Sequence, residues 1–242
     1  PGSETNFESP DMTEIIKPDL PASLDDGTYF VSGIDTDAGK TVCTGWLARE
    51  LMNAGRRVAT MKFVQTGSSD AQSPDIVLHR RIMGVELPED ARRITAPECF
   101  TYPASPDLAA RMDGRSIDFE RIETCVALLE QAYDVVLVEG AGGLMVPLTE
   151  NLTTIDYVKQ RQWPMLFVTS GKLGSINHTL LSWEALANRQ ITLSAVIYNC
   201  HNPMPDALID ADTRVYLHRS AQQAFPEALW LECPILNSEE IG

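Results

Sequence analysis

The residues best suited to chemistry in this chain form a glycine-rich loop over residues 33–41. The loop reads Gly-Ile-Asp-Thr-Asp-Ala-Gly-Lys-Thr, lies downstream of the apolar run Tyr-Phe-Val and precedes a segment with helical spacing. In a strand–loop–helix unit of this kind, backbone N–H groups and the helix N-terminus bind phosphate oxygens. Lys40 would neutralise the β- and γ-phosphates of a nucleoside triphosphate, and the Thr41 hydroxyl would bind Mg²⁺. The alternative, a glycine turn with a chance Gly-Lys-Thr, is disfavoured by this placement.

A lysine and a threonine occur at the end of the second apolar run. Lys62 starts the sequence Lys-Phe-Val-Gln-Thr-Gly, in which Thr66 is the threonine. A cation at a strand end beside a phosphate site can stabilise charge that develops on a transferred phosphoryl group. Taken by itself, this motif is equally compatible with an exposed surface lysine.

Two acidic residues are candidates for the remaining ligands of a magnesium ion. Glu139 follows the apolar run Val-Val-Leu-Val and begins Glu-Gly-Ala-Gly-Gly, whose glycines would let the backbone approach a nucleotide. An acid at the end of a buried strand, downstream of a phosphate loop, is typical of a magnesium ligand, with a purely structural acid as the alternative. Asp75 follows Ser-Pro at the start of a predicted helix, and by itself it is most simply a helix cap or a first-turn acid.

Two further polar segments follow later apolar runs. Residues 171–178 read Gly-Lys-Leu-Gly-Ser-Ile-Asn-His and lead into a helix, so they are a second candidate anion site or simply a structural loop. Asn199 closes the run Val-Ile-Tyr, where its amide could contact the edge of a nucleotide base or end the strand in a turn.

Apolar runs and helical patterns alternate along the chain and predict the elements that must position these motifs. The alternation predicts an α/β fold, with a mostly parallel, doubly wound sheet covered by helices on both faces. In such sheets ligands bind beyond the carboxyl ends of the strands, where every motif above falls. The predicted strands cover 29–31, 58–64, 134–138, 165–168 and 193–197, and the predicted helices cover 41–54, 75–83, 117–132 and 175–188.

Length and composition predict a single domain. The chain has 242 residues, of which 44% are hydrophobic, which is enough for one large α/β domain. Residues 1–26 contain four prolines and many small or acidic residues, and we expect them to form a disordered tail. The domain is therefore expected over 27–242, with an irregular stretch over 84–115.

Charge and hydropathy exclude several classes of partner. The net charge of −15 repels phosphate backbones and argues against a nucleic-acid partner. No apolar run approaches the ~18–20 residues of a membrane span, and the polar start is not a secretory signal, so we expect no membrane partner and a cytoplasmic location. Five scattered cysteines without a C-x-x-C pair favour reduced thiols, and the four histidines show no metal-ligand spacing.

The set of motifs, in the order in which they occur along the chain, resembles that of the dethiobiotin synthetases. These are enzymes of biotin synthesis with a P-loop NTPase fold. The glycine loop, G-x5-G-K-T, has the same extra residue as that family, and residues 138–143 match its Val-Glu-Gly-Ala-Gly-Gly. Residues 172–178 and the Pro-Ala-Ser-Pro at 103–106 are also similar, and the resemblance spans roughly 28–236. Departures are Ile34 for threonine, Ala38 for valine and Phe63 for proline, and the last of these is expected to affect the position of Lys62.

The resemblance implies ATP-dependent ring closure of 7,8-diaminononanoate with CO2 (or bicarbonate) to dethiobiotin. Lys40 and Lys62 would be catalytic, stabilising the phosphoryl charge, while Thr66 would bind the substrate amine or carbamate. The metal would be Mg²⁺, held by Thr41, Asp75 and Glu139. To the nucleotide site we assign Gly33, Asp37, Ala38, Gly39, Lys40, Thr41, Val42, Asp75, Glu139, Gly140, Ala141, Gly142, Asn199 and Pro234.

The resemblance also implies a homodimer in which one subunit completes the site of the other. The substrate carries amines at one end and a carboxylate at the other, so two separated sites are required. The loop with Gly174, Ser175 and Asn177 would bind the carboxylate at a helix N-terminus, with Tyr216 assisting.

A second class of function remains as an alternative, a partitioning-type switch ATPase that acts through a protein partner. Such proteins usually carry an additional lysine early in the phosphate loop, and residues 34–38 contain none. The C-terminal segment also lacks a basic amphipathic anchor. An amide synthetase of the cobyrinate type would need an ammonia-producing domain, for which this chain has no room.

Overall fold

A six-stranded parallel sheet forms the centre of the protein. The computed structural model describes residues 16–68, 73–201 and 206–237. In this part of the chain the strands lie in the order β2-β3-β1-β6-β7-β8, and every neighbouring pair is parallel. The strands are β1 (Gly27–Gly33), β2 (Val58–Lys62), β3 (Val135–Glu139), β6 (Met165–Ser170), β7 (Leu193–Asn199) and β8 (Leu229–Cys233). The predicted α/β sheet is confirmed.

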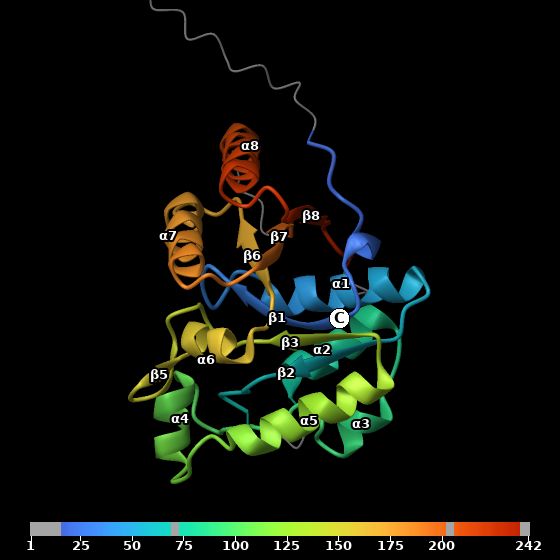
Figure 1. The fold of residues 1–242 in the computed structure, drawn as a ribbon, viewed down its shortest axis with the longest axis vertical. Helices are drawn as coiled ribbons and strands as arrows, with labels where there is room; N and C mark the ends of the chain where they lie inside the picture. Colours follow the sequence, from blue (N-terminus) through green and yellow to red (C-terminus); the bar gives the residue numbers. More distant parts are fainter. Residues whose placement is uncertain (1–15, 69–72, 202–205, 238–242) are drawn as a thin grey trace, which may run out of the picture.

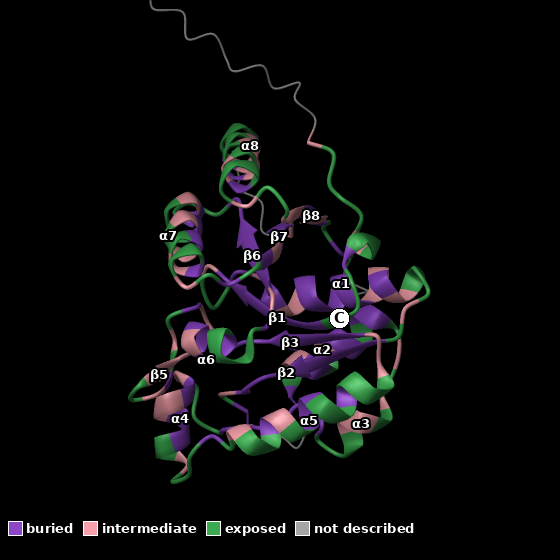
Figure 2. Ribbon diagram, in the orientation of Figure 1, coloured by how far each residue is buried: buried purple, intermediate pink, exposed green. Residues whose placement is uncertain are grey.

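The sheet is buried on both faces, as a doubly wound parallel sheet requires (Figure 2). Helices α1 (Lys40–Asn53) and α2 (Pro74–Met83) lie on one face, where Leu47 of α1 packs in the same apolar cluster as Val31 and Leu137. The other face carries α5 (Phe119–Ala132), α6 (Thr154–Arg161), α7 (Ser175–Asn188) and α8 (Ala207–Ala224) (Figure 1).

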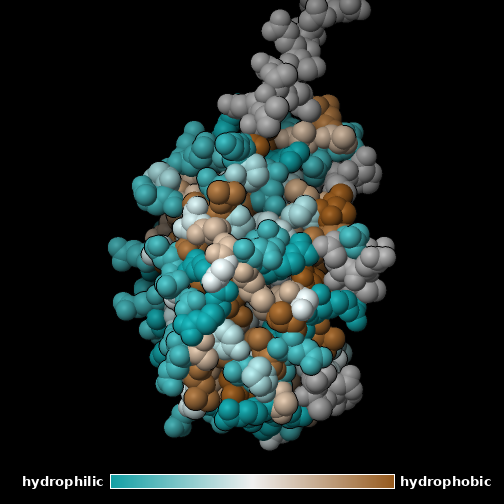
Figure 3. Space-filling model, turned by 90° about the vertical axis from the view of Figure 1, so that its right-hand side faces the viewer, coloured by the Kyte–Doolittle hydropathy of each residue, from teal (hydrophilic) through white to brown (hydrophobic). Residues whose placement is uncertain are grey.

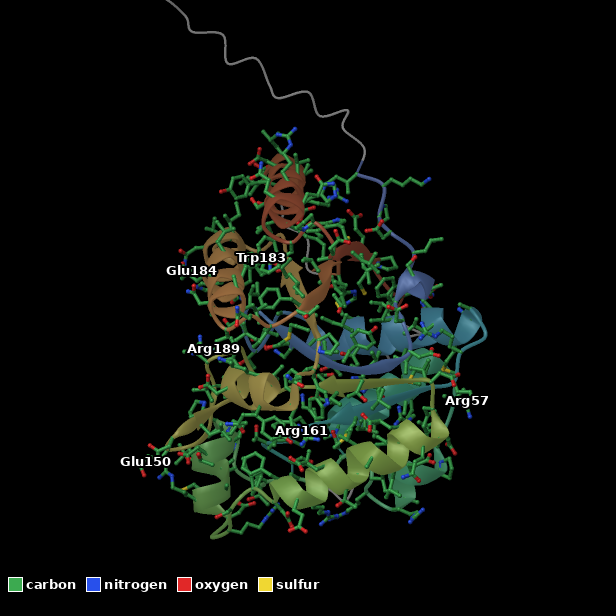
Figure 4. All side chains as sticks on the ribbon, in the orientation of Figure 1. Arg57, Glu150, Arg161, Trp183, Glu184 and Arg189 are labelled. Atoms are coloured by element: carbon green, nitrogen blue, oxygen red, sulfur yellow. The ribbon has the colours of Figure 1, made fainter. Side chains whose placement is uncertain are left out.

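Amphipathic helices seal the second face. On α7, Trp183 points toward the sheet and is buried, whereas the neighbouring Glu184 points away into solvent (Figure 4).

The surface seen in Figure 3 is a mixture in which small apolar areas are scattered among hydrophilic residues. Among the described residues, no helix is both long enough and apolar enough to cross a membrane.

The structure adds elements that the sequence patterns do not predict. Residues 84–115, expected to be irregular, contain the short helices α3 (Pro88–Ala91) and α4 (Pro106–Met112). The strands β4 (Pro147–Thr149) and β5 (Leu152–Thr153) form a separate antiparallel pair, and α6, α8 and β8 are also additional. Helix α8 is not predicted because it buries only three residues. Thr213, Leu217 and Ala221 form a buried face too narrow to give a clear helical pattern in the sequence.

The expected tail over 1–26 is described only from residue 16, since residues 1–15 lie outside the described part. Residues 21–23 form a single 3-10 turn, η1 (Pro21–Ser23). Asp19 lies against β8, because its backbone N–H donates to the Trp230 carbonyl and its carboxylate accepts from the Trp230 N–H at 2.7 Å. This part of the segment therefore contacts the edge of the sheet. All five cysteines are described, and each is a free thiol.

Candidate active site

The glycine loop joins β1 to α1 at the carboxyl edge of the sheet. Gly39 has φ of +87°, in the left-handed region, and a Cβ atom built there would overlap Nδ2 of Asn199. The same Nδ2 donates a hydrogen bond to the carbonyl oxygen of Ala38 at 3.0 Å. The loop is thereby tied to the end of β7, and only glycine fits at position 39.

Lys40 begins α1 and is almost fully buried inside the loop. Its ammonium group donates to the carbonyl oxygen of Asp35 at 2.7 Å and lies 3.4 Å from that of Thr36. Burial lowers the pKa of Lys40 to about 8, against the opposing effect of the Glu139 carboxylate. A nucleotide phosphate offers this ammonium a stronger, charged acceptor than two carbonyls.

Glu139 is the centre of a charged cluster at the ends of β2 and β3. Lys62 and Glu139 are register partners on these neighbouring strands, which explains why two side chains 77 residues apart meet. Oε1 of Glu139 accepts hydrogen bonds from Lys62 Nζ at 2.8 Å and from Thr41 Oγ1 at 3.0 Å. Oε2 lies 2.7 Å from Nε2 of His79. Lys62 also forms an ion pair with Asp75.

Contacts between opposite charges stabilise the ionised forms of Glu139 and Lys62, whereas burial lowers the pKa of Lys40. Burial opposes ionisation of Glu139, but Lys62 and His79 outweigh it and hold the pKa of that carboxyl well below its usual range. Burial likewise opposes the charge of Lys62, and the carboxylates of Glu139 and Asp75 outweigh it, so the pKa of Lys62 is raised. Lys62 is therefore a buried lysine paired with two carboxylates, and not the exposed surface lysine that the motif alone allows.

These side chains surround one cavity of about 600 Å³ at the carboxyl edge of the sheet. The cavity brings together the glycine loop, the end of β2, the start of α2 and the segment after β3, as expected for a ligand site in a parallel sheet. Of the residues assigned from the sequence, its lining includes Asp37, Lys40, Thr41, Lys62, Thr66, Asp75, Glu139, Ala141 and Gly142. The stretch 103–106 lines it as well.

Asn199 and Pro234 lie outside this lining, at the adjoining strand ends. Asn199 pairs with Cys233 across β7 and β8, which puts Pro234 next to it. The Asn199 amide already donates to Ala38, and its oxygen accepts from the N–H of His201 at 3.0 Å. An amide has two donor hydrogens and two acceptor positions, so these two contacts use one of each.

The residues assigned to the substrate carboxylate are also separate from the cavity within one chain. Gly174, with φ of +92°, precedes α7, and Ser175 is its first residue. The Ser175 side chain is buried, 3.3 Å from the hydroxyl of Ser170, whereas Asn177 is exposed. Tyr216 lies in the middle of α8, half exposed. These residues do not line the cavity that contains Lys62.

Two residues near Glu139 make contacts that the sequence patterns do not predict. His79 contacts the carboxylate from α2, and only its spacing of four residues from Asp75 could have indicated a shared helix face. Phe63 replaces the proline expected from the resemblance, and its backbone N–H donates to the Glu139 carbonyl at 2.8 Å. Its ring packs against Phe30 and Tyr157, at centroid distances of 5.6 and 4.9 Å.

The donor set fits magnesium better than a soft metal. Thr41, Asp75 and Glu139 offer hydroxyl and carboxylate oxygens, which Mg²⁺ prefers, and Mg²⁺ is usually bound by one or two carboxylates with phosphate and water completing its shell. Among the described residues, no group of three or more His, Cys, Asp or Glu side chains could hold a metal by itself. Phosphate or water oxygens would complete the shell of a metal held by these residues.

Comparison with known proteins identifies relatives along most of the chain. A family described as an AAA domain matches residues 27–227. The chain is 49% identical over 203 residues to the ATP-dependent dethiobiotin synthetase BioD 2 of Pasteurella multocida, covering 84% of this chain and 94% of that protein. It is 48% identical over 185 residues to the ATP-dependent dethiobiotin synthetase BioD of Chlorobaculum tepidum, covering 76% and 77%.

Among solved structures, a pNOB8 ParA bound to nonspecific DNA has a similar fold. The TM-score is 0.51, with coverage of 87% of this chain and 80% of that chain, at 13% sequence identity. At this identity the likeness concerns the fold alone.

Proposed function

Because the chain belongs to the family of ATP-dependent dethiobiotin synthetases, we propose that the cavity of about 600 Å³ is where this enzyme closes the ring of dethiobiotin. The protein is an ATP-dependent ligase of biotin synthesis, with ATP, the diamine and CO2 as substrates. One observation supports the residue assignments: Lys62 and Thr41 both donate to Glu139 inside a cavity that Thr66 also lines. A partitioning-type switch role is not favoured by these relatives.

The chemistry needs three steps that this cavity can host. One amine of 7,8-diaminononanoate adds to CO2 and loses a proton, which gives a carbamate. A carbamate oxygen then attacks the γ-phosphorus of ATP, so that ADP leaves and a carbamic–phosphoric anhydride forms. The second amine attacks the carbonyl carbon and closes the ring, and phosphate leaves. Phosphoryl transfer requires chiefly positioning and charge neutralisation, which lysines provide.

Different residues of the cavity would bind the nucleotide, stabilise the reacting groups and hold the amine substrate. Lys40, released from its loop carbonyls, binds the β- and γ-phosphates, and the glycines around Ala141 let the backbone approach them. Lys62 stabilises the charge shared by the carbamate and the transferred phosphoryl group, because it is held as a cation at the cavity wall. Thr66 binds the amine or carbamate end of the substrate.

Magnesium completes the nucleotide site. Thr41, Asp75 and Glu139 would hold it, and when bound it neutralises phosphate charge. Asp75 and Glu139 both contact Lys62 in this structure, so the two carboxylates are already arranged around a cation. A cytoplasmic location also stays a prediction from the sequence.

A homodimer with a shared site is the second part of the proposal. A hollow of about 410 Å³ between α7 and the segment after β3 is lined by Met145 and Leu181, both more than half exposed. Leu173, beside the proposed carboxylate loop, is 81% exposed. Val146 lines both this hollow and the catalytic cavity. An apolar surface continuous with the site suits a second copy of the chain, which would bring Asn177 to the carboxylate.

The activity is tested by one assay with the diamine, bicarbonate, Mg²⁺ and ATP. We expect dethiobiotin and phosphate in equal amounts, with phosphate release dependent on the diamine. Slow ATP hydrolysis that is indifferent to the diamine would instead indicate a switch ATPase.

The shared site is tested by mixing two inactive variants, Lys62→Gln and Asn177→Trp. Asn177 is chosen because it is exposed, whereas Ser175 is buried and a bulky residue there would disturb α7. If the site is shared, mixed dimers contain one intact site and activity returns. No recovery despite demonstrated subunit exchange would assign the whole site to one chain.

A further inference from the structure

His79 is a fully buried histidine on the helix that carries Asp75. The two residues are four positions apart in α2, so they share one face of the helix, and their contacts with Thr60, Lys62 and Glu139 turn that face toward β2 and β3. Asp75 lines the cavity and pairs with Lys62, whereas His79 lies behind the cavity and contacts Glu139. None of the roles proposed above uses this histidine.

The contacts of Glu139 divide between its two carboxylate oxygens. Oε1 accepts from Lys62 at 2.8 Å and from Thr41 at 3.0 Å, on the side of the cavity. Oε2 is 2.7 Å from Nε2 of His79, on the side of α2. An ionised carboxylate only accepts hydrogen bonds, so Nε2 of His79 must be the donor. This bond fixes the rotation of the carboxylate and directs Oε1 into the cavity.

The histidine ring is itself held from behind. Its Nδ1 lies 3.0 Å from the hydroxyl of Thr60 in β2, and that hydroxyl accepts a hydrogen bond from Arg80 at 2.7 Å. Arg80 in turn donates to both carboxylate oxygens of Asp90, at 2.7 and 2.8 Å. The chain of contacts runs from Asp90 through α2 and β2 to Glu139, and each member is at least mostly buried.

We propose that His79 is a positioning residue, which holds Oε2 of Glu139 so that Oε1 is presented to Thr41 and the magnesium–nucleotide complex. The inference rests on the proposed function in that Glu139 is taken as a magnesium ligand. Hydrogen bonds behind a ligand typically change metal affinity by ~10–100-fold when they are lost. The effect should therefore appear in the Mg²⁺ requirement, and not in nucleotide binding without metal.

Substitutions at two positions separate this role from simple packing. In His79→Gln the side-chain amide nitrogen can occupy the place of Nε2 and keep the bond to Glu139. In His79→Asn the amide nitrogen instead matches Nδ1 and loses that bond, while His79→Leu keeps volume without any donor. Thr60→Val removes the hydroxyl behind the ring, together with the bond that it accepts from Arg80, and leaves His79 itself unchanged.

The main measurement is Mg²⁺-dependent binding of ADP by calorimetry, with the Mg²⁺ concentration for half-maximal activity as the second. We expect His79→Leu and His79→Asn to require ~10–100-fold more Mg²⁺, and His79→Gln to remain within about threefold of the wild type. ADP binding without Mg²⁺ should not change, and thermal unfolding without ligands reports whether each variant folds.

One outcome would overturn the inference. If folded His79→Gln and His79→Asn show the same Mg²⁺ requirement, the bond to Glu139 is irrelevant and His79 only fills space. If His79→Leu does not fold, the comparison of His79→Gln with His79→Asn still decides the matter, and Thr60→Val should raise the Mg²⁺ requirement by less than His79→Asn does. A wild type that binds ADP with Mg²⁺ but makes no dethiobiotin would contradict the proposed function, while leaving this test of His79 intact.

Discussion

The side-chain amide of Asn199 donates a hydrogen bond to the carbonyl oxygen of Ala38 at 3.0 Å, across 161 residues of the chain. This contact joins the end of β7 to the glycine loop, immediately beside Gly39. Because Gly39 has no side chain, the amide can approach the loop backbone closely. The shape of the glycine loop therefore depends on a strand that lies far away in the sequence.

Gly39→Ala is expected to abolish ATP binding, because the new methyl group would collide with the Asn199 amide. Gly55 is a matched control: its φ of +89° is almost the same as the +87° of Gly39, but no atom lies within 4 Å of a built Cβ. Gly55→Ala should cost only the left-handed strain of ~1–2 kcal/mol and keep ATP binding. Calorimetry and thermal unfolding of both variants check this, and equal ATP affinities would contradict it.

Asp75→Asn is expected to raise the Mg²⁺ concentration needed for activity, because its carboxylate is proposed as a metal ligand. Asp107 provides the control, since both acids follow Ser-Pro in the first turn of a helix. The Asp107 carboxylate instead pairs with Arg111 on its own helix. Asp107→Asn should leave the Mg²⁺ titration unchanged. If the Mg²⁺ titration of Asp75→Asn also overlays that of the wild type, Asp75 is not a metal ligand and only stabilises the first turn of α2 and pairs with Lys62.

Lys62→Gln is expected to lower kcat strongly while nucleotide affinity changes little. The ammonium group contacts Glu139 and Asp75 and not the glycine loop, so its loss removes charge at the reacting centre. Loss of one such charged contact typically costs ~2–4 kcal/mol in the transition state. Steady-state kinetics and ADP calorimetry measure the two effects separately. A variant that loses ATP binding but keeps kcat at saturation would refute this role.

Phe63→Pro is expected to destabilise the protein more than Phe63→Leu. Both changes remove the ring from its contacts with Phe30 and Tyr157, but only proline also removes the N–H that donates to the Glu139 carbonyl. The lost hydrogen bond should add ~1–3 kcal/mol to the loss of unfolding free energy, because the carbonyl is left buried without that donor. Denaturant unfolding measures this difference, and identical values would show that the N–H contributes nothing.

Local patterns in the sequence were sufficient to define the unit that we propose to bind phosphate. A strand, a glycine loop and a helix are contiguous in residues 27–53, and their pattern follows from local backbone preferences and apolar spacing. The parallel sheet was also predictable, because alternating strands and helices bury two faces in only a few ways. With parallel strands established, Lys62 and Glu139 had to reach the same edge.

Which of these side chains touch was settled by the folding of the whole chain. The contact of His79 with Glu139 joins residues 60 positions apart, and that of Asn199 with Ala38 joins residues 161 apart. Such pairs depend on strand order, register and helix rotation, which packing of the whole chain sets and no local pattern encodes. Phe63 is a further example, because it stands where the resembling sequences have proline. Only the folded chain shows that its N–H donates to the Glu139 carbonyl and that its ring packs against Tyr157.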